Sequence, residues 1–208
     1  MPRPWFLFAH GAGAPSSSPW MRRWRDYLRA IGEVVTFDYP YMQARRKMPD
    51  RMPALVAAHR EQLANVRAAA NGAPIILAGK SMGSRVGCHV SLEEPVDGLV
   101  CIGYPLVSGS SGALRDEVLV ALRTPILFVQ GSHDSLCPLP KLEDVRARMT
   151  APNWLHAVQD ANHSLELPSV KRTPALQKDV EISALEAIRR FLEDLNKTAP
   201  QAVRGRHA

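Results

Sequence analysis

Two short apolar runs constrain the fold of this chain more than any other feature. Residues 74–78 read PIILA and residues 125–130 read PILFVQ, and neither run alternates between apolar and polar side chains. A continuous apolar run of this length is typical of a strand that is covered on both faces, as in a parallel sheet. We therefore expect helices on both sides of a sheet.

Four further segments have the length and composition of strands, and helical patterns separate them. The expected strands are 5–9, 34–39, 74–78, 99–104, 125–130 and 154–158. The expected helices are 19–31, 53–70, 81–92, 139–149 and 174–195. Alternation of strand and helix predicts the α/β class, with a doubly wound, mostly parallel, six-stranded sheet.

The length of the chain favours one domain. With 208 residues, of which 46% are hydrophobic, the chain can form one well-buried core. We expect this domain to span residues 1–195. Residues 196–208 are polar, basic and interrupted by Pro200, so we expect a disordered tail there.

The apolar segments are too short for membrane insertion or export. A membrane span needs roughly 18 to 20 consecutive apolar residues, and no run approaches that length. The N-terminal run WFLFA is also shorter than the roughly 7 to 15 residues of a signal-peptide core. These observations predict a cytoplasmic protein without a membrane partner.

Cysteine spacing and charge exclude several classes of site. Cys88, Cys101 and Cys137 are odd in number and lack CxxC spacing, which argues against a disulfide framework and against a zinc site. The net charge of +6 comes from cations in separate segments, without a basic stripe interleaved with aromatic residues. We therefore expect no nucleic-acid partner.

The stretch GKSMG at 79–83 fits parts of two motifs. A P-loop, GxxxxGK[ST], needs its first glycine where this chain has Pro74, and strand-forming residues occupy the expected loop. A nucleophile elbow needs a strand, a sharp turn and a helix, with small residues two positions before and after the serine. Gly79 and Gly83 meet that need around Ser81. The context favours a serine nucleophile.

A serine nucleophile requires a base and an acid, which follow an elbow in the order acid then histidine. Asp134 follows the fifth expected strand, and His163 follows the sixth. His133 is an alternative base, but it precedes Asp134 and has no acid after its own strand. Asp160 is an alternative acid, but it lies on the same turn as His163. We predict Ser81, His163 and Asp134 as the catalytic residues.

The reaction also needs two N–H donors that hold a developing oxyanion. One is expected from Met82, the residue after the nucleophile, at the start of a helix. The other is expected from the glycine-rich loop HGAGAPSSS after the first strand, where backbone can approach the substrate closely. We assign this second donor to Ala12, with Gly13 as the alternative.

Six segments together resemble a small α/β-hydrolase family: FAHGAGA, AGKSMGSR, CIGYPL, LRDE, PILFVQGSHDSLCP and ANHSL. The family includes bacterial dienelactone-hydrolase-like proteins, the hydrolase-like domain of a subunit of the NSL histone-acetyltransferase complex, and a testis-expressed relative. The resemblance spans about residues 6–195 and implies an α/β-hydrolase fold with Ser81, Asp134 and His163 as its triad. Dienelactone hydrolases proper carry cysteine at the elbow, where this chain has Ser81. The resemblance therefore does not imply that this chain shares their particular substrate.

Two departures from the usual α/β-hydrolase plan predict an open, minimal site. The six expected strands lack the first two of the usual eight, and the connection 105–124 is too short for a cap domain. Lys80, Tyr104 and Tyr41 are candidate substrate contacts, although each tyrosine can equally be ordinary packing. Lys80 and Arg85 flank the nucleophile and indicate an anionic substrate, although Arg85 can instead brace the turn and Lys80 can be a spacer.

These features predict a serine hydrolase of the esterase or thioesterase type. It would act on a small-molecule ester or thioester through an acyl-enzyme, and this chemistry needs no metal or organic cofactor. The alternative is a catalytically silent interaction module with a hydrolase fold, because the resemblance extends to subunits of complexes.

Overall fold

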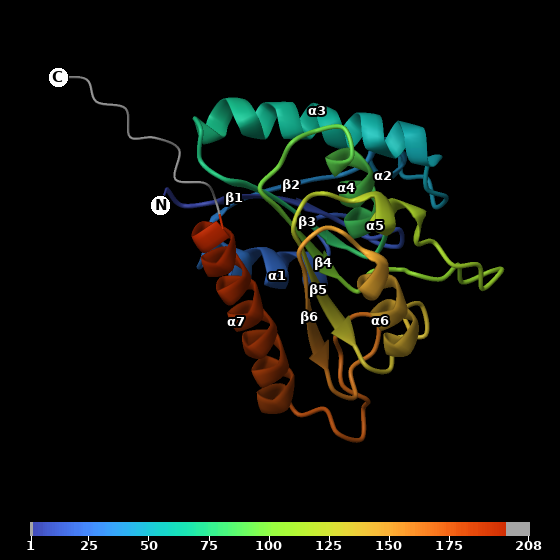
Figure 1. The fold of residues 1–208 in the computed structure, drawn as a ribbon. Coiled ribbons are helices and arrows are strands. Elements are labelled where there is room, and N and C mark those ends of the chain that lie inside the picture. The colour runs from blue at the N-terminus through green and yellow to red at the C-terminus, as the bar shows by residue number, and fades with distance from the viewer. Residues whose placement is uncertain (1, 199–208) are drawn as a thin grey trace.

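The computed structural model describes residues 2–198, and its centre is a parallel six-stranded sheet in the order β2-β1-β3-β4-β5-β6 (Figure 1). The strands are β1 (Trp5–Ala9), β2 (Glu33–Phe37), β3 (Ile75–Lys80), β4 (Gly98–Ile102), β5 (Ile126–Gly131) and β6 (Asn153–Val158). Each neighbouring pair is parallel. The predicted doubly wound α/β sheet is confirmed.

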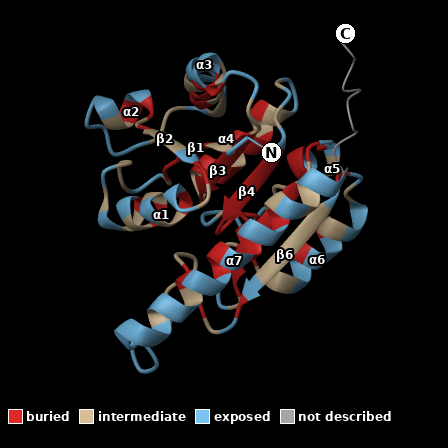
Figure 2. Cartoon of the chain, turned by 90° about the vertical axis from the view of Figure 1, so that its left-hand side faces the viewer, coloured by how far each residue is buried: buried red, intermediate tan, exposed pale blue. Residues whose placement is uncertain are grey.

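Helices cover both faces of this sheet. One face packs against α1 (Pro19–Arg29) and α7 (Pro174–Thr198). The other packs against α3 (Met52–Ala70), α4 (Met82–Ser91), α5 (Glu117–Ala121) and α6 (Leu139–Arg148), with α2 (Pro40–Gln43) beyond the edge strand. Figure 2 shows β3 and β4 buried along their length, which accounts for the continuous apolar composition of such strands.

The element boundaries differ from the sequence-based expectation in specific places. The second strand ends at Phe37 rather than at residue 39, because Pro40 starts the short helix α2, and proline suits the first turn of a helix. The third strand continues to Lys80, two residues further than expected. Neither α2 nor α5 was expected, since each is only about one turn long.

The expected C-terminal tail falls largely outside the described residues. Helix α7 continues to Thr198, three residues past the expected domain end at residue 195. Residues 199–208, the rest of the expected tail, lie outside the described part of the chain. Between residues 2 and 198, no helix has both the length and the apolar character needed to cross a membrane.

A buried histidine beside the sheet is expected to make folding sensitive to acid. His59, on α3, is fully buried, and its Nδ1 lies 3.0 Å from the Tyr39 hydroxyl, while its Nε2 has no hydrogen-bond partner among residues 2–198. Burial lowers the pKa of His59 from 6.5 to about 3. The folded protein therefore keeps His59 neutral at pH values where the unfolded chain takes up a proton.

His59→Asn is expected to reduce the acid sensitivity of folding. Below pH 6.5 the unfolded wild-type chain binds one more proton at this site, so its unfolding free energy falls by up to about 1.4 kcal/mol per pH unit, until His59 also protonates in the fold near pH 3. Urea unfolding at pH 7, 6 and 5 should show this loss shrinking in His59→Asn. The exposed His133→Asn is the control and should keep the wild-type slope. Parallel curves for wild type and His59→Asn would contradict this account.

Candidate active site

The turn between β3 and α4 holds Ser81 in a strained conformation. Its backbone has φ 51° and ψ −114°, which a residue other than glycine adopts at a cost of about 1 to 3 kcal/mol. The Ser81 N–H donates to the carbonyl of Ile102 on β4, at 3.0 Å. The strand, turn and helix of the expected elbow are therefore present.

The two glycines of this turn are required by close backbone packing. A Cβ atom on Gly79 would lie 2.2 Å from the backbone nitrogen of Ser84, and one on Gly83 would lie 2.5 Å from the carbonyl oxygen of Ala9. Any side chain at either position would therefore push α4 away from the sheet. The GxSxG spacing thus has a steric cause in this fold.

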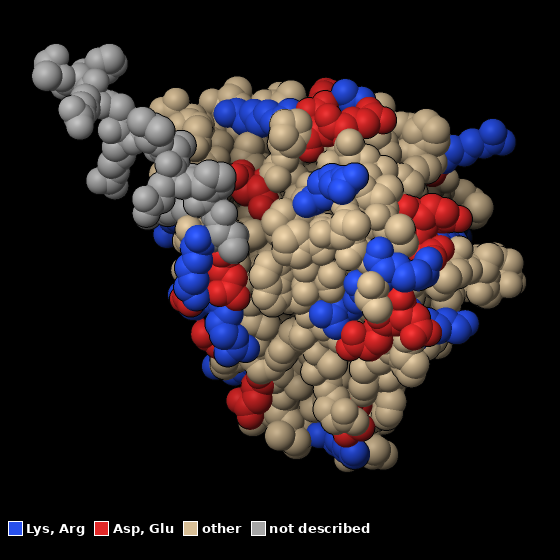
Figure 3. All heavy atoms as spheres, in the orientation of Figure 1, with Lys and Arg blue, Asp and Glu red and all other residues tan. Residues whose placement is uncertain are grey.

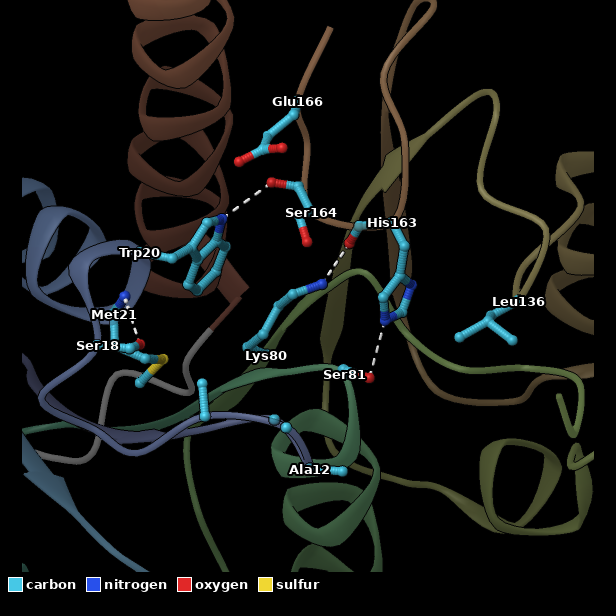
Figure 4. Close-up of a pocket in the computed structure, with 13 residues that line it drawn as sticks. Ala12, Ser18, Trp20, Met21, Lys80, Ser81, Leu136, His163, Ser164 and Glu166 are labelled. Carbon is cyan, nitrogen blue, oxygen red and sulfur yellow. Dashed lines mark hydrogen bonds between the residues drawn. The ribbon is translucent and has the colours of Figure 1, made fainter. Parts of the chain in front are cut away.

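Ser81, His163 and Asp134 form a continuous chain of hydrogen bonds. The Ser81 Oγ lies 2.8 Å from His163 Nε2, and His163 Nδ1 lies 2.7 Å from Asp134 Oδ2 (Figure 4 shows the first contact). Asp134 follows β5 and His163 follows β6, so the carboxyl ends of parallel strands bring them together. Both distances suit proton transfer from a hydroxyl to an imidazole that a carboxylate orients.

Three donors hold the buried carboxylate of Asp134. Besides His163, Gln130 Nε2 donates to Oδ2, and the Leu136 N–H donates to Oδ1 at 2.8 Å. Gln130 is fully buried at the end of β5, and its Oε1 accepts a hydrogen bond from the Tyr104 N–H at 2.9 Å. Sequence reasoning missed Gln130. The sequence feature that could have indicated it is the single polar residue at the end of the apolar run PILFVQ.

The alternative base and acid form a separate pair at the surface. The His133 side chain is 62% exposed, and its Nε2 lies 3.9 Å from Asp160 Oδ1. Asp160 also forms a 2.7 Å ion pair with Lys171. The hydrogen bonds of Ser81 and His163 involve neither of these alternatives.

The loop after β1 is braced next to Ser81. His10 accepts a hydrogen bond from the Tyr39 N–H at Nε2, so its Nδ1 carries a proton and donates to the Gly11 carbonyl at 2.6 Å. Burial lowers the pKa of His10, which favours this neutral form. The Tyr41 hydroxyl donates to the Ala12 carbonyl at 3.0 Å. Two side chains therefore hold the loop that contains the expected Ala12 donor.

A cavity of about 410 Å³ opens in front of Ser81. The loop after β1, including Ala12 and Gly13, forms one wall, and Trp20 and Met21 of α1 form another. Figure 4 shows His163, Ser164 and Glu166 on the side that follows β6. The hydrogen-bonded chain of Ser81, His163 and Asp134 and this opening together describe a site that admits a small molecule to a serine hydroxyl.

Comparison with known proteins identifies the family. The model of the family described as "Alpha/beta hydrolase domain" matches residues 2–193. This chain belongs to the α/β-hydrolase domain family. The predicted α/β-hydrolase fold is therefore confirmed.

Solved structures of other α/β-hydrolases have the same fold. An α/β serine hydrolase homologue from Coxiella burnetii has a TM-score of 0.71 and 16% identity over 88% of this chain and 84% of its own. A serine hydrolase without a lid from Xanthomonas campestris has a TM-score of 0.66 and 17% identity over 89% and 82% of the two chains. A dienelactone hydrolase from Anabaena variabilis has a TM-score of 0.66 and 20% identity over 89% and 85%.

The two tyrosines expected as substrate contacts are not among the residues that line the cavity of this α/β-hydrolase. Tyr104 is fully buried and packs edge-on against Phe128, with ring centroids 5.9 Å apart. Tyr41 is also buried, and its hydroxyl supports Ala12 instead. Both side chains follow strands, as expected, but they turn into the core. Arg85 is likewise absent from the cavity lining.

Lys80 reaches the cavity of the α/β-hydrolase and also holds the loop after β6, which contains His163. The side chain is 9% exposed, and its Nζ donates to the carbonyl of His163. The same Nζ lies 5.5 Å from the ring centroid of Trp20, whose Nε1 donates to the carbonyl of Ser164 at 2.9 Å (Figure 4). Burial lowers the pKa of Lys80 to about 8, although Asp134 and Glu166 oppose that change.

Proposed function

We propose that this α/β-hydrolase is a serine hydrolase that cleaves small carboxylic esters or thioesters. The observation that supports this most strongly is the hydrogen-bonded chain from Ser81 through His163 to Asp134, which ends at an open cavity. A serine hydroxyl in such a chain is activated for attack on a carbonyl carbon. Solved neighbours described as serine hydrolases support the same chemistry.

In the proposed reaction, the Ser81 Oγ bonds to the substrate carbonyl carbon while its proton moves to His163 Nε2. The tetrahedral intermediate then expels the alcohol or thiol, which takes that proton, and an acyl-enzyme remains. His163 next removes a proton from water, the hydroxide attacks the acyl carbon, and Ser81 leaves with the proton returned. Asp134 orients the imidazole and stabilises its positive charge.

The oxyanion in this reaction would be held by backbone N–H groups. Met82 is the first residue of α4, so its N–H lies at a helix N-terminus, where negative charge is favoured. Ala12 lines the cavity beside Ser81, and its carbonyl is engaged by Tyr41. We assign Met82 and Ala12 as the two donors.

Turnover of neutral p-nitrophenyl esters tests this proposal. Wild-type protein should hydrolyse p-nitrophenyl acetate or butyrate at a rate that depends on Ser81. The alternative, a catalytically silent interaction module, predicts equal background rates for wild type and Ser81→Ala. Equal rates with folded proteins would therefore exclude the enzymatic proposal.

Lys80→Met is expected to lower kcat by about tenfold to a hundredfold with little change in KM. We assign Lys80 a positioning role, because its ammonium group holds the backbone of His163, and small displacements of a catalytic base are costly. Stability at pH 7 should change little. Loss of the charged hydrogen bond from Nζ destabilises the fold by about 1.5 to 3 kcal/mol. Removal of the buried ammonium group stabilises the fold by about 3 kcal/mol, which offsets that loss.

Steady-state kinetics and urea unfolding of Lys80→Met measure these two effects. Lys141→Met on α6 is the control and should match wild type in both. A rise in KM with kcat unchanged would show that Lys80 contacts the substrate and does not position His163.

A further inference from the structure

A second cavity adjoins the one in front of Ser81. Its volume is about 620 Å³, and it shares Ala12 and Gly13 with the first cavity. Its remaining walls are Pro15, Met42 and three consecutive cations, Arg45, Arg46 and Lys47, which we call the basic turn. The loop that supplies the proposed oxyanion donor therefore separates a catalytic cavity from a positively charged one.

The charges of the two cavities differ. The first contains one cation, Lys80, and one carboxylate, Glu166. The second has the basic turn and, among the described residues that line it, no acidic one. An anionic group would consequently be attracted to the second cavity rather than to the first.

Two cations of the basic turn have no ion-pair partner among residues 2–198. Arg46 pairs with Asp50 at 2.7 Å, whereas Arg45 and Lys47 form no salt bridge within the described chain. On the face shown in Figure 3, by contrast, many Lys and Arg side chains lie next to Asp or Glu. Arg45 and Lys47 of the basic turn are thus available to an external anion.

The basic turn is tied to the loop after β1 by hydrogen bonds. The Arg45 N–H donates to the Met42 carbonyl at 2.9 Å, and the Arg46 N–H donates to the Tyr41 carbonyl at 2.8 Å. The Tyr41 hydroxyl in turn donates to the Ala12 carbonyl at 3.0 Å. These contacts fix the backbone of the basic turn relative to the loop beside Ser81.

We propose that the second cavity binds a phosphate group on the alcohol or thiol half of the substrate that reacts at Ser81. This inference rests on the proposed function and specifies its substrate class: an acyl ester or thioester whose leaving group is phosphorylated. The acyl group would occupy the first cavity, against Trp20, Met21 and Leu136, with the carbonyl near Ala12. Arginine suits phosphate because its planar guanidinium donates two parallel hydrogen bonds.

A pair of thioesters that differ only in one phosphate tests the proposal. We would measure kcat/KM for S-butyryl-4′-phosphopantetheine and for S-butyryl-pantetheine, whose flexible arm can span two adjoining cavities. Wild-type protein should prefer the phosphorylated thioester by about tenfold to a hundredfold, as expected for charge-assisted contacts. In Arg45→Gln/Lys47→Gln this preference should fall towards one, and in wild type it should weaken as ionic strength rises.

The control is Arg22→Gln/Lys141→Gln, which removes two exposed cations of α1 and α6 and should keep the wild-type preference. Turnover of both thioesters at equal kcat/KM would overturn this inference and leave the proposed function intact. A preference that persists in Arg45→Gln/Lys47→Gln would also overturn it. Failure of the folded wild type to hydrolyse either thioester or p-nitrophenyl butyrate would overturn both the inference and the proposed function.

Discussion

Ser81→Ala is expected to lower kcat for p-nitrophenyl butyrate by about 10⁶-fold, if the triad acts as a unit. The substitution removes the oxygen that we propose attacks the carbonyl carbon, so no acyl-enzyme should form. It leaves the backbone of the elbow in place, because Gly79 and Gly83 provide the close packing of α4 against the sheet. Initial rates at saturating substrate, with circular dichroism to verify folding, measure this effect.

Ser91→Ala is the matched control for the loss of a serine hydroxyl. Ser91 ends the same helix, and its Oγ donates to the Cys88 carbonyl at 3.0 Å, remote from the cavity. Its kcat should equal that of wild type. A Ser81→Ala protein that retains more than about 1% of wild-type kcat would contradict the assignment of Ser81 as nucleophile.

Asp134→Asn is expected to lower kcat by about 10⁴-fold, with a smaller effect on substrate binding. The Asp134 carboxylate accepts hydrogen bonds from His163, Gln130 and the Leu136 N–H, and as a carboxylate it has no proton to donate. An asparagine amide places an N–H₂ group towards one of these donors. If that group faces His163, the proton of the imidazole moves to Nε2, which then cannot accept the proton of Ser81.

Asp160→Asn is the control that separates the loss of kcat in Asp134→Asn from a general change of charge near His163. Asp160 lies three residues before His163 and pairs with Lys171 at the surface. Its substitution should leave kcat within about twofold of wild type, because surface ion pairs contribute little. If Asp160→Asn lost as much activity as Asp134→Asn, the assignment of Asp134 as the orienting acid would be wrong.

The sequence predicted the parts of this structure that depend on regular chain geometry. Buried strands have a recognisable apolar composition, and parallel strands place their carboxyl ends at one edge of the sheet. Ser81, Asp134 and His163 were therefore expected at the same edge, and the structure places them within hydrogen-bond distance of each other. Their catalytic roles belong to the proposed function.

The parts that the sequence did not predict depend on side-chain direction and on packing between distant segments. Gln130, at the end of β5, holds both Asp134 and the backbone of Tyr104. Tyr41 turns inward to support Ala12, and Lys80 reaches the backbone of His163, which lies far from it in sequence. No periodicity in the sequence specifies such contacts, since they arise only when the loops are assembled on the sheet.

The central claim is that Ser81 is an activated nucleophile, and covalent labelling tests it most directly. Folded wild-type protein should react with a fluorophosphonate probe, with loss of fluoride and a mass increase of one phosphonyl group on the peptide that contains Ser81. Ser81→Ala should remain unlabelled, and Ser91→Ala should label like wild type. Absence of an adduct on the folded wild type, or an adduct that persists in Ser81→Ala, would contradict the account.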